Sequence, residues 1–206
     1  MKFIIGFMLL LGTMSLSIGG IDKNESSKHI QEAKIDTFTF SSGAFEINGQ
    51  IYLPASFSKE KNFHAIYLID FTEQHFKVAR DEFEKVIAAT EEIQGLSAVV
   101  VTLEEHLDVD ANTGVFQKYY NIYKNMVSYV DANYTNNASR TFIGRGSEGG
   151  LVLMTLFLED STTSIFENFV ATDSPTSFNS HIRGMINGEN FPDQKSNKKL
   201  HFSFSR

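Results

Sequence analysis

The chain has 206 residues, which is enough for one domain with a sizeable core. It contains no cysteine, which excludes disulfides, zinc–thiolate sites and cysteine nucleophiles. A formal net charge of −7 without a basic stretch makes the chain a poor candidate for binding nucleic acid or an anionic membrane. The six histidines lack metal-ligand spacing, so we expect neither a metal ion nor another cofactor.

The first 20 residues have the pattern of a secretory signal peptide. Lys2 supplies the positive start, Phe3 to Leu11 are apolar, and small residues follow up to Gly20. A membrane anchor is the alternative, but the apolar run is short for a membrane span. We therefore expect a secreted or periplasmic protein that leaves the membrane after cleavage. Residues 21–36 are polar and charged, which predicts a flexible leader.

The rest of the chain, residues 37–206, is predicted to form one α/β domain. Residues 37–40 and 45–54 alternate between apolar and polar, which indicates two antiparallel strands joined by a turn at 41–43. Continuous apolar runs then alternate with segments of helical periodicity, which predicts a mostly parallel sheet covered on both faces. The predicted strands are 64–70, 97–103, 141–143, 169–172 and 200–204, and the predicted helices are 76–93, 116–134 and 151–158.

The run from Arg140 to Gly150, RTFIGRGSEGG, carries the clearest functional signal. It reads as a strand, a glycine-rich turn carrying Ser147, and the start of a helix. This is the setting of a nucleophile elbow, in which a serine sits on a sharp turn between strand and helix. The N–H of Glu148 would lie at the helix N-terminus and act as an oxyanion donor. The pattern predicts acyl transfer to Ser147.

Six segments share one pattern of order and spacing. They are IYLP at 51–54, IYLID at 66–70, VVVTLEE at 99–105, YVDANY at 129–134, RTFIGRGSEGG at 140–150 and FVATDSPTSF at 169–178. Together they resemble the esterase branch of the α/β-hydrolase superfamily, which includes the ferric-siderophore esterases and esterase D-like proteins. The resemblance implies the α/β-hydrolase fold, a small-molecule ester substrate and Ser147 as the nucleophile. It also implies Glu148 N–H and Phe71 N–H as the two oxyanion donors.

The sequence also departs from the pattern of this family. Arg145 stands two residues before Ser147, where close crossing of strand and helix needs a small residue. The carboxylate of Glu148 would oppose negative charge in an oxyanion site. The sequence ends at the strand 200–204, so the resemblance supplies no position for the acid or the histidine of a triad. The local substitutes are Asp173, His181 and His201, and for each a structural role is the simpler interpretation.

Three alternatives follow from these departures. The first is a non-catalytic binding protein of the same fold. The second is a dinucleotide-binding domain, because Gly144, Gly146 and Gly149 form a G-x-G-x-x-G run and Asp173 ends the next strand. The third is the front part of a longer hydrolase, whose last strand would leave a sheet edge prone to self-association. We expect the loop 179–197 to set specificity.

Overall fold

A computed structural model describes the chain in six stretches: residues 32–59, 62–69, 81–104, 113–159, 164–174 and 198–204. The predicted signal peptide, Phe71, His181 and the loop 179–197 lie outside these stretches. Within them, no helix is both long and apolar enough to cross a lipid bilayer.

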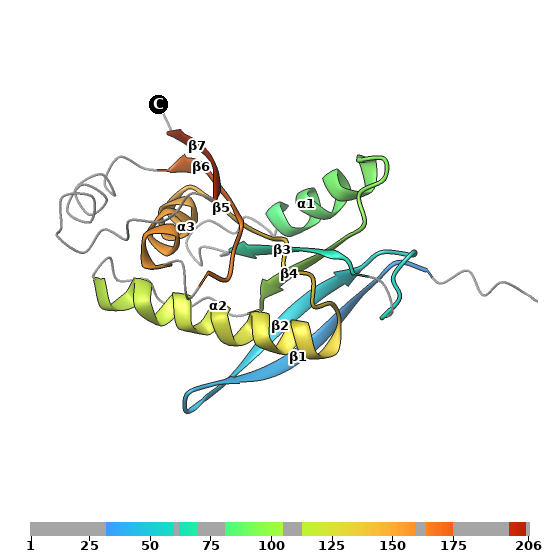
Figure 1. Cartoon of the computed structure of the whole chain (residues 1–206), viewed down its shortest axis with the longest axis horizontal. Helices are drawn as coiled ribbons and strands as arrows, with labels where there is room; N and C mark the ends of the chain where they lie inside the picture. Colours follow the sequence, from blue (N-terminus) through green and yellow to red (C-terminus); the bar gives the residue numbers. More distant parts are fainter. Residues whose placement is uncertain are drawn as a thin grey trace, which may run out of the picture.

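The described residues form one mixed sheet of seven strands in the order β1-β2-β4-β3-β5-β6-β7 (Figure 1). β1 pairs antiparallel with β2, and β2 pairs antiparallel with β4. All pairings from β4 to β7 are parallel. The strands are β1 (Lys34–Ser42), β2 (Phe45–Leu53), β3 (His64–Ile69), β4 (Ala98–Leu103), β5 (Arg140–Arg145), β6 (Asn168–Ser174) and β7 (Lys199–Phe204).

Two predicted boundaries near the start of the domain are wrong by a few residues. β1 begins at Lys34, inside the predicted leader, and it ends at Ser42, beyond the predicted start of the turn. Lys34 and Asp36 pair through the backbone with Leu53 and Ile51. Ladder hydrogen bonds do not require apolar side chains, so an alternation pattern misses the polar end of an edge strand.

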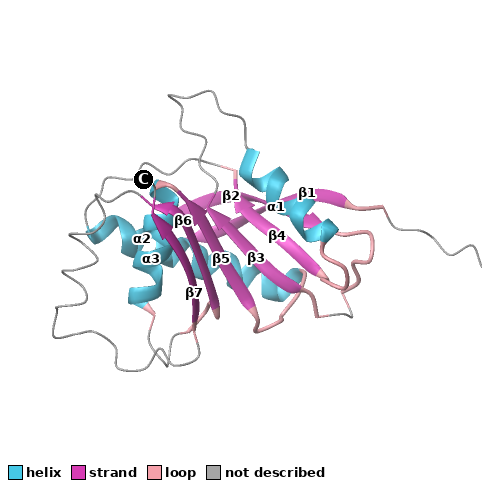
Figure 2. Cartoon of the chain, turned by 90° about the horizontal axis from the view of Figure 1, so that it is seen from above, coloured by secondary structure: helices cyan, strands magenta, loops and turns pink. Residues whose placement is uncertain are grey.

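Three helices cover the two faces of the sheet: α1 (Asp81–Glu92), α2 (Thr113–Asn133) and α3 (Ser147–Leu158). Figure 2 shows α1 in front of the sheet, with α2 and α3 behind it. The core divides in the same way. Alternate residues of β3 and β4, such as Ile66 and Val100, pack with Phe83 of α1, whereas Tyr67 and Val101 belong to the larger cluster under α2 and α3.

This arrangement confirms the predicted α/β class and most of the predicted elements. The apolar face predicted for residues 116–134 is buried in α2, including Tyr119, Tyr123 and Met126. The predicted helix 76–93 extends one residue too far, because α1 ends at Glu92 and Ile93 is 56% exposed. The carboxyl ends of the parallel strands meet at one edge of the sheet, where α/β proteins place their ligand sites.

Candidate functional site

Gly144 lies where strand β5 and helix α3 cross most closely. A Cβ atom built on Gly144 would lie 2.5 Å from the backbone oxygen of Glu148 and 2.9 Å from the nitrogen of Gly149. These atoms belong to the backbone of α3 and cannot rotate away. Glycine at residue 144 is therefore what allows the helix to start directly above the strand.

Gly146 forms the tip of the turn between the strand and the helix. Its φ of 62° and ψ of −129° lie in a region that glycine adopts readily and other residues adopt only under strain. Its N–H donates a 2.8 Å hydrogen bond to the carbonyl of Thr172 on β6, which fixes the tip against the sheet. A Cβ atom at this residue would meet only Glu148 Oε2, at 3.7 Å, so there is room for a side chain.

These two glycines place the centre of the elbow at Gly146. The closest backbone approach joins Gly144 to Glu148, which are two residues before and two residues after Gly146. A nucleophile elbow of the G-x-S-x-G type has its small residues at these same offsets from the nucleophile. Ser147 follows the tip by one residue and is the first residue of α3. The N–H directly after the tip therefore belongs to Ser147 and not to Glu148.

Arg145 points outward from the elbow and joins two other elements. Its side chain is 55% exposed, with Nε 2.9 Å from Asp173 Oδ2 and Nη1 2.9 Å from Glu82 Oε1. Hydrogen bonds to these two carboxylates raise the pKa of the guanidinium. The sequence predicts the close crossing with α3 at Arg145, but the residue that faces α3 is Gly144. Arg145 is the next residue of β5, and successive residues of a strand face opposite sides of the sheet, so its side chain points away from α3. Asp173 is held beside the elbow by this ion pair, with its own φ at 52°.

A pocket of about 240 Å³ opens beside the elbow. Leu68, Val86 and Ile143 supply apolar wall, and Arg145, Glu82, Glu148 and Asp173 supply charge. Three carboxylates against one guanidinium give the pocket a net negative charge. Its residues come from the carboxyl ends of β3, β5 and β6, from the first turn of α3 and from α1.

Comparison with solved structures identifies the architecture. An IroE-like serine hydrolase from Shewanella oneidensis matches with a TM-score of 0.58 and 14% identity, over 74% of this chain and 55% of its own. An esterase from Pyrobaculum calidifontis matches with a TM-score of 0.51 and 14% identity, over 68% and 45%. A protein called FAE matches with a TM-score of 0.53 and 16% identity, over 82% and 66%.

The chain has the α/β-hydrolase fold. It spans about half the length of the first two of these structures. No protein-family model and no curated protein matches the sequence. The predicted resemblance to esterases of the α/β-hydrolase superfamily is thus confirmed at the level of the fold.

The α/β-hydrolase fold argues against the dinucleotide-binding alternative. In a dinucleotide-binding domain the glycine fingerprint occupies the first strand-to-helix turn of a parallel sheet. Here the glycine run follows β5, and β2 is antiparallel to its neighbour β4. Asp173, the acidic residue on which this alternative rests, is paired with Arg145.

The remaining predicted site residues have mixed outcomes. His201 lies on the edge strand β7 and is exposed, which agrees with the simpler structural interpretation. Phe71 and His181 cannot be placed, since they lie outside the described residues. In the part of the chain that the structure describes, no three His, Asp or Glu side chains gather as metal ligands. The roles of Ser147, Glu148 and Phe71 stay predictions.

Sequence reasoning missed Glu82 as a residue of the pocket rim. Glu82 lies on α1, far from the elbow in sequence, and it reaches the pocket only because α1 packs over the ends of β3 and β5. The signal that pointed to it was the unexplained charge of Arg145. A guanidinium near a site can pair with carboxylates, but the sequence does not say which ones.

Proposed function

We propose that this chain binds a small-molecule ester in the elbow pocket and has lost the nucleophile at the tip of the turn. The observation that carries this proposal is the backbone of Gly146, which takes the strained tip position between Gly144 and Glu148. Glycine offers no hydroxyl at the position that carries the nucleophile in a G-x-S-x-G elbow. The chain would then be a binding protein built on a hydrolase fold. We also propose that it is secreted or periplasmic, because residues 1–20 have the pattern of a signal peptide.

The charge of the pocket restricts the esters that it would accept. Glu82, Glu148 and Asp173 outnumber Arg145, so an anionic ligand would meet net repulsion. The apolar wall of Leu68, Val86 and Ile143 favours an acyl or aryl group. We therefore expect neutral or cationic esters to bind and anionic esters to be rejected.

The second candidate function is ester hydrolysis through acyl transfer to Ser147. It is favoured by the location of Ser147 at the N-terminus of α3, directly after the tip. The helix dipole and the first N–H groups of a helix favour negative charge at such a position. Under this alternative the nucleophile would lie one residue after the tip of the turn and not at the tip.

Covalent labelling separates the two functions. The full chain and its Ser147→Ala variant would be treated with a fluorophosphonate and weighed by intact mass spectrometry. The binding function predicts no adduct on either protein. An adduct on the wild-type chain that disappears in Ser147→Ala would establish the second candidate and refute the first.

Ligand binding supplies the positive test. The probe is p-nitroacetanilide, an amide analogue of a neutral aryl ester, and binding is followed by ligand-observed NMR. We expect the Ser147→Ala variant to bind the probe as the wild type does. Val86 is a partly buried residue of the pocket wall, so the larger side chain of Val86→Trp should fill the pocket and abolish binding. Absence of binding, or binding that Val86→Trp leaves unchanged, would contradict the proposal.

The position of the tip is tested separately with an introduced thiol. The natural chain has no cysteine, so Gly146→Cys carries a single reactive group. Both cysteine variants are made in a Glu148→Gln background, because the carboxylate of Glu148 would lie close to the thiol and oppose its ionisation. In that background a thiol at the N-terminus of α3 should have a lowered pKa and react with iodoacetamide at neutral pH. The matched control is Gly95→Cys, which also replaces a glycine of positive φ (82°) but follows the C-terminal end of α1. We expect Gly146→Cys to react about tenfold faster than the control, and equal rates would argue against the assignment.

A further inference from the structure

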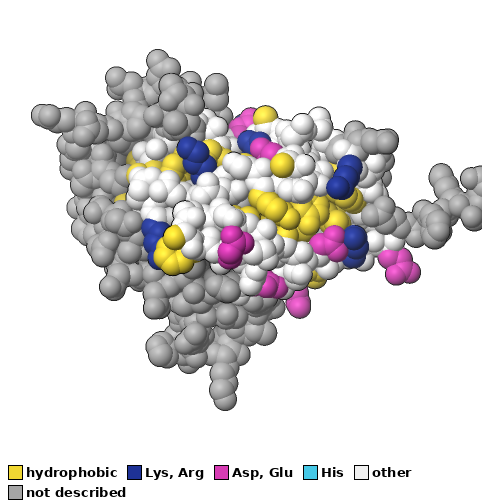
Figure 3. Space-filling view, turned by 90° about the horizontal axis from the view of Figure 1, so that it is seen from below, with side chains coloured by type: hydrophobic (Ala, Val, Ile, Leu, Met, Phe, Trp, Pro, Cys, Tyr) yellow, Lys and Arg dark blue, Asp and Glu magenta, His cyan; other side chains and the backbone are white. Residues whose placement is uncertain are grey.

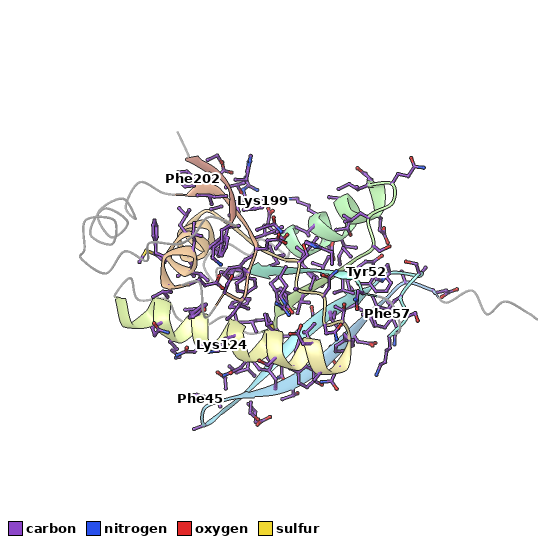
Figure 4. All side chains as sticks on the ribbon, in the orientation of Figure 1. Phe45, Tyr52, Phe57, Lys124, Lys199 and Phe202 are labelled. Carbon is purple, nitrogen blue, oxygen red and sulfur yellow. The ribbon has the colours of Figure 1, made fainter. Side chains whose placement is uncertain are left out.

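A second hollow lies away from the elbow, between the β1–β2 hairpin and α2. It has a volume of about 600 Å³ and is lined by the hairpin tip and by one side of the first half of α2. Gly49 of β2 pairs with Leu103, the last residue of β4, so the hairpin tip extends beyond the carboxyl end of that strand. Figure 4 shows Phe45 at this tip and Lys124 on α2 above it. We call this hollow the hairpin groove.

An exposed aromatic ring forms one wall of the hairpin groove. Phe45 is 64% exposed, although a side chain of this type is usually buried. The ammonium of Lys118 lies 5.8 Å from the centre of the ring. Figure 3 shows the underside of the molecule, where hydrophobic patches lie among both basic and acidic side chains. The ammonium lies over one face of this ring, so the exposed part of the ring is an apolar surface next to a positive charge.

Amide side chains form the opposite wall. Gln117, Asn121 and Asn125 follow one another at intervals of four residues, so they share one face of α2. Gln117 Nε2 donates to Asn121 Oδ1 at 3.3 Å, and Asn125 Nδ2 donates to Ser42 Oγ at 2.9 Å. Each amide combines two N–H donors with a carbonyl acceptor, which is the chemistry that pairs with neighbouring hydroxyl groups.

The charge of the hairpin groove is opposite to that of the whole chain. Lys118 and Lys124 line it, and no carboxylate is among its described lining residues. The chain as a whole carries a formal charge of −7. The groove thus concentrates positive charge on an acidic protein, and this local charge favours an anionic ligand.

We propose that the hairpin groove binds an anionic oligosaccharide of the uronic-acid type. The C–H face of a sugar ring would stack on Phe45, because the face of an aromatic ring is electron-rich. The amides of Gln117, Asn121 and Asn125 would bind the hydroxyl groups. The ammonium groups of Lys118 and Lys124 would pair with the carboxylates. A simple phosphate ion would use the lysines and the N–H donors of the amides, but it has no apolar face to stack on the ring.

The proposal does not depend on chemistry at the elbow. Strands β4 and β3 separate β2 from β5, so roughly 14 Å of sheet lies between the hairpin and the turn at Gly146. Both sites nevertheless lie at the carboxyl edge of the parallel strands. The elbow pocket carries net negative charge and the hairpin groove positive charge, so the two sites select different ligands.

The test is a titration of the full chain with tri-galacturonate, in which binding is measured by isothermal titration calorimetry. We expect a dissociation constant of about 1 mM or lower, with binding at least tenfold weaker for a neutral galactotriose of the same linkage. Saturating inorganic phosphate should not displace the sugar. Absence of binding at about 10 mM, equal affinity for the neutral sugar, or full displacement by phosphate would each overturn the proposal.

Variants assign the binding to the groove. Phe45→Ala and the double variant Lys118→Gln/Lys124→Gln should each weaken binding of tri-galacturonate by about tenfold. The control is Lys199→Gln, which makes the same change of charge on the exposed edge strand β7. All of these side chains are exposed, so we expect thermal midpoints near that of the wild type. Equal weakening by Lys199→Gln, or none by Phe45→Ala, would refute the site.

Discussion

At the scale of single residues, Gly144 and Gly146 are required for different physical reasons. Gly144 has an ordinary backbone conformation, and the backbone of α3 excludes any side chain there. Gly146 has space for a side chain but a positive φ that disfavours one. Glycine is therefore required at residue 144 by steric contact alone and at residue 146 by backbone conformation alone.

The contact at Gly144 leads to a direct prediction. Gly144→Ala should lower the free energy of unfolding by about 3 kcal/mol, because the added methyl group meets backbone atoms that cannot rotate away. The comparison is Gly95→Ala, where a Cβ meets nothing within 4 Å and only the positive φ is strained. That change should cost about 1 kcal/mol. Urea unfolding of both variants measures the difference, and equal losses would show that the crossing is less close than we describe.

His64 predicts how stability responds to acid. Its ring Nε2 lies 2.8 Å from Thr141 Oγ1, and burial lowers its pKa in spite of the opposing charge of Glu167. A lowered native pKa means that the unfolded chain binds the proton more readily. Stability should therefore fall as the pH drops from about 6.5 toward the native pKa.

The His64→Gln variant isolates this contribution. Above about pH 6.5 His64 is neutral in both states and adds no pH dependence. We expect the variant to lose less stability than the wild type between pH 7.5 and pH 5.5 in urea unfolding. If both proteins lose the same amount, then His64 does not contribute to the acid sensitivity.

At the scale of elements, a buried ion pair fastens α3 to the start of β7. Glu159 directly follows α3 and is fully buried, and it pairs with Lys198 just before β7. The carboxylate also accepts the N–H groups of Ile165 and Phe166, at 3.0 and 3.1 Å. Burial raises the pKa of Glu159, and this outweighs the opposing effects of Lys198 and the two N–H groups. The pair thus links the end of α3 to the residue that precedes the last strand.

Removing only the cation of this pair should lower the free energy of unfolding more than removing both charges. Lys198→Met should destabilise the chain by about 3 kcal/mol, because it leaves a buried carboxylate without its cation. In Glu159→Gln/Lys198→Met the neutral amide oxygen can still accept both N–H groups, so most of the loss should be recovered. Lys199→Met, on the exposed neighbour, is the control. A double variant no more stable than Lys198→Met would contradict this account.

At the scale of the whole molecule, β7 completes the sheet described here. It pairs in parallel with β6 from Asn168 to Ser174, and Phe202 packs against the main core. Without β7 the hydrogen-bonding edge of β6 would be open, and exposed edges promote association between chains. Loss of residues 198–204 would also remove the contact of Phe202 with the core and the cation that pairs with Glu159, so we expect the fold to depend on this segment.

A chain ending at residue 174 tests this dependence. It loses both the cover of β6 and the cation that pairs with Glu159, so we expect aggregation and loss of near-ultraviolet circular dichroism. Size exclusion with light scattering gives the oligomeric state. The control is Leu200→Gln in the full chain, which changes an apolar residue that is 48% exposed and should leave the fold intact. A truncated chain that remains a cooperatively folding monomer would refute the argument.

The sequence by itself determined the type and order of most strands and helices and the buried face of the helix at residues 116–134. Apolar runs such as HAIYLI and AVVVTL can be satisfied only in strands that are covered on both faces, and the periodicity of residues 116–134 fits only a helix. The glycine-rich run also located the elbow, because few structures need so many small residues between a strand and a helix. These features are local, so neighbouring residues are enough to reveal them.

Only the tertiary structure decided the details of the site. Whether residue 146 or residue 147 forms the tip depends on how closely β5 and α3 cross, and the two alternatives differ by one residue in an almost symmetrical run of glycines. The partners of Arg145 come from α1 and β6, which are distant in sequence and meet only through the order of the strands. Contacts between distant segments depend on packing of the whole chain, and no local pattern records them.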